Sequence, residues 1–135
     1  MMLAKLILVA LVTVGAMQSA PAPSNDTPTS LPSADPKILM KAQEWFYRFQ
    51  TGKIDRSQLD VRTNNGLTQQ MVAGEEKTLQ ALGRPSKWLY FGSQPVQYAV
   101  GYEFGIQFKH ARVLEHIAFD ADGKIAGLQF QVYPY

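Results

Sequence analysis

The sequence contains no cysteine and only two histidines, and this scarcity excludes several kinds of site. Without cysteine, the chain forms no disulfide, has no thiol nucleophile and cannot carry a lipid on a cysteine. His110 and His116 are six residues apart, a separation of about 20 Å along a strand, which is too far to bind one zinc ion. We therefore predict no metal site and no cofactor.

The chain also lacks an excess of charge of either sign, with 13 basic and 11 acidic residues. Binding to nucleic acid or to an anionic membrane surface requires clustered lysine and arginine, whereas here the two signs alternate along the chain. We therefore predict no nucleic-acid partner.

A long apolar run is missing as well. Lys5 is followed by an apolar segment, Leu6 to Val14, which is shorter than the roughly 20 residues that span a bilayer and is typical of a signal peptide. Residues 1–20 are the predicted signal, with cleavage between 16 and 22 and an uncleaved anchor as the alternative. After cleavage the protein is not expected to be an integral membrane protein, and we expect a periplasmic or secreted bacterial location.

Residues 21–36 hold five prolines among small polar residues, a composition typical of a flexible leader. The remaining segment, 37–135, is long enough for one domain with a single core. We predict that this domain is the only one in the chain.

Two helices are predicted at the start of this domain. The first begins near Ser33 or Asp35 with Pro36 in its first turn and ends at Gly52. Its apolar residues follow helical spacing: Ile38, Ala42, Trp45, Phe46 and Phe49. The second runs from about Thr68 to Leu82, with Leu67, Met71, Leu79 and Leu82 as its apolar stripe.

From Lys87 the apolar residues alternate as in strands. The alternation predicts strands at 88–91, at 96–106, around 113–119 and around 128–132, with Asp120 to Gly123 as the turn between the last two. This turn resembles the start of a calcium loop, but the later acidic ligands are replaced by Lys124, Gln129 and Gln131. The predicted fold is α+β, with two N-terminal helices packed on a curved four-stranded antiparallel meander.

Three segments carry a resemblance to known domains: Gly52 to Leu59, Leu79 to Pro85 and Phe119 to Leu128. They resemble a small, uncharacterised secreted domain of the cystatin-like or nuclear-transport-factor-2-like roll type, which is also found fused to serine hydrolases of the β-lactamase type. The resemblance implies the roll fold and an exported location, but no catalytic residues. The Ser-x-x-Lys nucleophile motif of such hydrolases is absent from this sequence.

Glu115 is the strongest single candidate for a catalytic residue. Alternation places it on the same strand face as Val113 and Ile117, and a carboxyl group beside an apolar wall gains a raised pKa suited to proton transfer. Trp45, Tyr98 and Tyr102 are the other predicted pocket residues. The alternative is that Glu115 lies near the sheet edge or pairs with Arg112 or Lys109.

Three hypotheses of function follow. The first is a non-enzymatic exported binding or accessory module that acts on an unidentified protein or envelope component, because no catalytic constellation is present. The second is a small-molecule-binding or isomerase-type roll enzyme that uses Glu115 as a base in a concave pocket. The third is an inhibitor or immunity-type protein against a secreted hydrolase or toxin.

Overall fold

The computed structural model describes residues 33–135, so the predicted signal and most of the predicted leader lie outside the described residues. The element order is α1 (Pro36–Thr51), a 3-10 turn η1 (Arg56–Gln58), α2 (Val61–Gly66), α3 (Gln69–Gln80), β1 (Lys87–Val96), β2 (Ala99–Gln107), β3 (Ala111–Asp120) and β4 (Ile125–Pro134). The strands form one antiparallel sheet in the order β1-β2-β3-β4. The predicted α+β meander is therefore confirmed.

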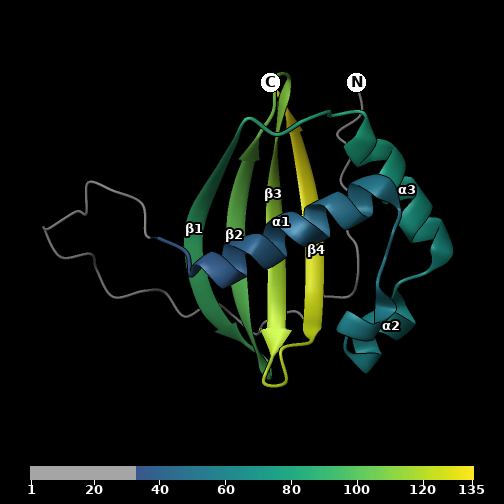
Figure 1. The fold of residues 1–135 in the computed structure, drawn as a ribbon, viewed down its shortest axis with the longest axis vertical. Helices are drawn as coiled ribbons and strands as arrows, with labels where there is room; N and C mark the ends of the chain where they lie inside the picture. Colours follow the sequence, from purple (N-terminus) through teal and green to yellow (C-terminus); the bar gives the residue numbers. More distant parts are fainter. Residues whose placement is uncertain (1–32) are drawn as a thin grey trace, which may run out of the picture.

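Helix α1 runs diagonally across one face of the sheet, while α2 and α3 lie beyond the β4 edge (Figure 1). We call the face toward α1 the inner face and the opposite face the outer face. Helix α1 begins where the carboxylate of Asp35 accepts a hydrogen bond from the Lys37 amide, and it ends at Gly52. Gly52 adopts a left-handed conformation with φ of 73°, which glycine tolerates without strain.

The core forms between α1 and the inner face. Helix α1 supplies four of the five residues predicted from its spacing, Ala42, Trp45, Phe46 and Phe49, all buried, and the fifth, Ile38, is partly buried against them. Phe46 and Phe49 pack edge to face on Phe130 of β4, with ring centroids 5.9 and 5.6 Å away. Phe46 also packs edge to face on Trp88 of β1, with ring centroids 5.8 Å apart, so the helix is held against both edge strands of the sheet.

Two parts of the predicted element pattern are wrong. Strand β1 continues to Val96, and the turn to β2 consists of Gln97 and Tyr98, which the prediction had placed inside one long strand. The sequence pattern concealed this turn because apolar or aromatic residues at 96, 98, 100 and 102 continue the alternation through it, and because neither turn residue is Gly, Asn or Asp. The structure also contains α2, whose six residues carry no apolar stripe and which was not predicted.

The turn prediction at the other hairpin is confirmed. One carboxylate oxygen of Asp120 accepts hydrogen bonds from the amides of Asp122 and Lys124, both at 2.9 Å, and Gly123 has a positive φ of 78°. The side chain that would open a calcium loop is therefore engaged by its own turn.

No helix in residues 33–135 is long and apolar enough to cross a membrane.

Candidate functional site

Glu115 lies at the centre of the inner face. The strand register places it in a row with Tyr90, Phe104 and Phe130, so aromatic residues flank it on both neighbouring strands. The side chain is 0% exposed, and neither carboxyl oxygen has a hydrogen-bond partner in the described part of the chain. Burial raises the pKa of Glu115 well above its ordinary value, because a buried environment disfavours the charged form.

The alternative positions for Glu115 are wrong. Strand β3 is an interior strand of the sheet, so Glu115 is not near an edge. Arg112 is three residues away on the same strand, so it projects from the outer face, and within residues 33–135 Glu115 forms no ion pair with Arg112 or Lys109.

Two of the other predicted pocket residues also belong to the inner side. Trp45 is fully buried on α1, and its indole N–H donates to Oε1 of Gln58 at 3.4 Å. Tyr102 is half-buried on β2 opposite Ile117, one row from Glu115, and its ring lies 6.0 Å from that of Phe119. Glu115 and Tyr102 therefore share a face on neighbouring strands.

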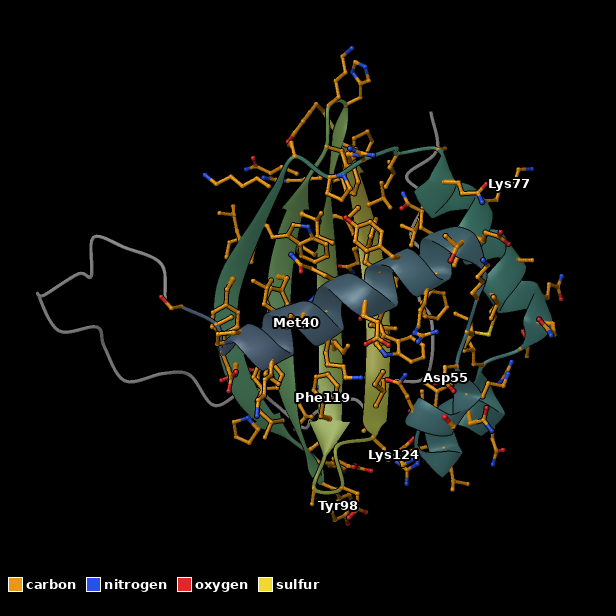
Figure 2. The ribbon with its side chains drawn as sticks, in the orientation of Figure 1. Met40, Asp55, Lys77, Tyr98, Phe119 and Lys124 are labelled. Carbon is orange, nitrogen blue, oxygen red and sulfur yellow. The ribbon has the colours of Figure 1, made fainter. Side chains whose placement is uncertain are left out.

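Tyr98 lies apart from this group. It occupies the tip of the β1–β2 hairpin, at the same end of the sheet as Lys124, and projects away from the molecule (Figure 2). Its side chain is 89% exposed, and its φ is +58°. Since Tyr98 is in the turn, it is not beside Glu115.

A second buried carboxyl group, Glu75 on α3, escaped the prediction. It is 0% exposed without a described hydrogen-bond partner, and burial raises its pKa to about 8. Its burial could have been predicted, since Glu75 lies four residues after Met71 and four before Leu79, within the apolar stripe of the helix. A carboxyl group at that position must be either paired or neutral.

The outer face carries a cleft of about 460 Å³ that sequence reasoning also missed. The residues that project into it come from all four strands: Leu89, Phe91, Glu103, Gly105, Gln107, Arg112, Leu114 and Tyr133. One sequence feature could have indicated this cleft. Leu89 and Leu114 occupy positions that alternation places on the outer face, where polar residues are usual.

A β-bulge shapes this cleft. The register of β1 against β2 shifts between Tyr90 and Gly92, which leaves Phe91 as an extra residue. The Phe91 ring lies directly over Gly105, since a Cβ atom at Gly105 would come within 2.7 Å of the ring. Only glycine at position 105 leaves room for this ring, which remains 42% exposed.

The two ends of the cleft carry opposite charges. At one end the Arg112 guanidinium lies over the Tyr133 ring, 5.7 Å from its centroid. At the other end Glu103 lies 3.3 Å from Nδ1 of His116. An apolar floor between two charges of opposite sign suits a small polar-ended ligand.

Another cleft, of about 700 Å³, lies where α1 and α3 end, and is lined by Tyr47, Gln50, Arg84 and neighbours. The Gln50 amide donates to the carbonyls of Leu79 and Gly83, so this polar group already has partners. Glu115 lines neither cleft.

Residues 33–135 contain no cluster of three histidine or acidic side chains that could hold a metal ion.

Comparisons of the chain with protein-family models, with curated proteins and with solved structures found no match.

Proposed function

We propose that this protein is an exported, non-enzymatic binding module that recognises its ligand in the outer-face cleft. One observation supports this function above the others: an apolar cleft with two charged ends lies on the sheet face that no described helix covers (Figure 1). Its volume falls within the range of about 300–1,000 Å³ that is usual for small-molecule sites.

The exported location rests on residues 1–20, whose charge and apolar run have the layout of a signal peptide, and on the absence of cysteine. The helices and meander are consistent with the cystatin-like or nuclear-transport-factor-2-like roll type, which we propose for the domain. Cell fractionation of a bacterium that expresses the tagged full chain tests the location. Recovery in the cytoplasmic fraction would contradict it.

The enzymatic alternative has one observation in its favour, the carboxyl group of Glu115, which lies on an aromatic wall and has no hydrogen-bond partner among residues 33–135. Glu115 is 0% exposed and lines neither cleft, so a substrate would reach it only after the core had opened. The cleft therefore favours the binding module. An inhibitor or immunity-type protein would belong to the same class and differ only in its partner.

Ligand mapping by two-dimensional amide NMR tests the binding function. A library of small apolar acids and amines is titrated into the ¹⁵N-labelled protein, and we expect the largest shifts around Leu89, Gly105 and Leu114. The variant Gly105→Ala displaces the Phe91 ring and should weaken binding.

The matched control is Gly74→Ala, because the added methyl group has open space on exposed helix α3 and should leave binding unchanged. Shifts that cluster around Tyr47 and Arg84 instead, or that persist unchanged in Gly105→Ala, would overturn the assignment of the cleft as the binding site.

A further inference from the structure

The charged ends of the outer-face cleft are placed by the strand register. Gln107 pairs with Arg112, and Glu103 pairs with His116, so the two pairs are separated by four residues along both strands. Gly105 and Leu114 form the pair between them. At about 3.3 Å per residue, the positive and negative ends are about 13 Å apart.

Arg112 has the properties of a carboxylate-binding group. Its side chain is exposed, and among residues 33–135 it forms no ion pair. The ring of Tyr133 supports one face of the guanidinium, and the Tyr133 hydroxyl donates to Gln131 Oε1 at 3.0 Å, which holds the ring in place. A planar guanidinium fixed on one face presents its N–H groups to a carboxylate as a fork.

Glu103 provides the complementary end. Its Oε2 atom faces Nδ1 of His116 at 3.3 Å, while Oε1 forms no ion pair within the described residues. A primary ammonium group is a compact donor that fits a carboxylate with a free oxygen.

The floor between these ends is apolar. Leu89, Leu114 and the ring of Phe91 over Gly105 form it. An extended chain advances about 3.3–3.6 Å per residue, so a span of about 13 Å fits three residues together with their terminal groups.

We propose that the cleft binds short apolar peptides, of about three residues, through both of their free termini. The C-terminal carboxylate pairs with Arg112, the N-terminal ammonium pairs with Glu103, and the apolar side chains cover Leu89, Phe91 and Leu114. This proposal rests on the proposed binding function and names the ligand class for the same cleft.

The test uses the purified full chain and three probes: trileucine, N-acetyl-trileucine and trileucine amide. Isothermal titration calorimetry measures the affinities, and amide NMR locates the site. We expect trileucine to shift the amides of Gly105 and Leu114, and each capped peptide to bind about three- to thirtyfold more weakly, because each has lost one charge pair.

Charge-removing variants assign each terminus to its partner. Arg112→Gln should bind trileucine and trileucine amide equally, but should still bind trileucine more tightly than N-acetyl-trileucine. Glu103→Gln should bind trileucine and N-acetyl-trileucine equally, but should still bind trileucine more tightly than trileucine amide. Arg62→Gln on α2 is the matched control, because Arg62 is exposed and lies outside the cleft, and it should retain both preferences. Unchanged amide spectra outside the cleft show that each variant is folded.

The outcomes separate the ligand class from the binding function. Equal affinity for capped and free peptides at the cleft would overturn the peptide class and leave a binding module in place. Concentration-dependent shifts of the same amides without any peptide would identify a second copy as the occupant and overturn the peptide class. Failure of every library compound and peptide to shift the cleft amides would overturn the binding function itself.

Discussion

Glu75 is a carboxyl group in a position that an apolar residue would fill, and this makes stability depend on pH. Burial raises its pKa to about 8 in the folded protein, against an ordinary value of 4.5. Between these two values the folded state holds a proton that the unfolded state has released. The contribution of Glu75 is therefore fully present below pH 4.5, and it is lost as the pH rises toward 8.

We expect Glu75→Gln to flatten this part of the pH profile, because glutamine cannot ionise. Relative to the variant, the wild type should lose stability by up to about 1.4 kcal/mol per pH unit as the pH rises between 5 and 8. Urea denaturation at several pH values measures the difference. The neighbouring Glu76→Gln, which removes a partly exposed carboxylate, should reproduce the wild-type slope; if it flattens the profile equally, Glu75 is not the responsible group.

Glu115 calls for a different substitution, since it faces aromatic rings on both neighbouring strands. Glu115→Leu replaces a buried polar group without a described partner by an apolar side chain of similar size. We expect the free energy of unfolding at pH 8 to rise by about 1–3 kcal/mol, because the desolvation cost of the carboxyl group is removed. If chemical denaturation at pH 8 shows that the free energy of unfolding has decreased instead, the carboxyl group must form a stabilising hydrogen bond.

At the scale of single elements, α2 depends on contacts from outside itself. A six-residue helix is too short to be stable alone. The Arg56 guanidinium donates to the carbonyls of Asn64 and Leu67, at 3.2 and 2.8 Å, and to Asn64 Oδ1 at 2.8 Å. Among residues 33–135 the Asn64 carbonyl otherwise accepts only a long hydrogen bond of 3.4 Å from the amide of Leu67, the residue that caps the helix, so Arg56 strengthens the hydrogen bonding at this helix end.

We expect Arg56→Lys to loosen α2, because a single ammonium cannot reproduce a forked set of three bonds. The loss should amount to about 1–3 kcal/mol and should increase the amide hydrogen exchange of residues 61–67 more than that of the strands. The exposed Arg62→Lys is the control and should exchange like the wild type. Uniform destabilisation of the whole domain would contradict a local role for Arg56.

The helices and strands differ in how well the sequence predicts them. Helices α1 and α3 and the antiparallel meander were predictable, since their apolar residues repeat with a helical or strand period over many residues. Helix α2 was not, because its stability comes from Asp60 and Arg56 rather than from its own pattern. The β1–β2 turn was missed because Gln97 and Tyr98 are not typical turn residues.

The candidate site was harder to predict than the fold. Alternation placed Glu115 on the same face as Val113 and Ile117, as the structure has it, but it could not indicate whether that face was open to a ligand. The outer-face cleft depends on the bulge at Phe91 and on the register that brings Glu103 and Arg112 to its two ends. Register is a property of the paired strands and is not visible in one strand's pattern.

At the scale of the whole molecule, the two faces of the sheet have different surroundings. The inner face packs on α1 and holds the aromatic core, whereas the outer face presents the cleft. Alternation along each strand assigns every residue to one face, so a substitution on one face leaves the side chains of the other in place. Stability and binding should therefore be separable by mutation.

Trp45→Ala and Phe91→Ala provide this separation, since each removes one large aromatic side chain. Trp45 is fully buried, so its loss should cost about 3–5 kcal/mol, a large share of the stability of a domain this size. Phe91 is 42% exposed, so Phe91→Ala should lower the free energy of unfolding much less than Trp45→Ala does. The same variant should weaken the binding of small apolar ligands to the cleft, because the ring over Gly105 is gone. Urea denaturation and calorimetric titration on the same two samples measure both effects. Equal losses of stability from the two variants would contradict the separation, because Phe91 would then belong to the core rather than to the binding surface.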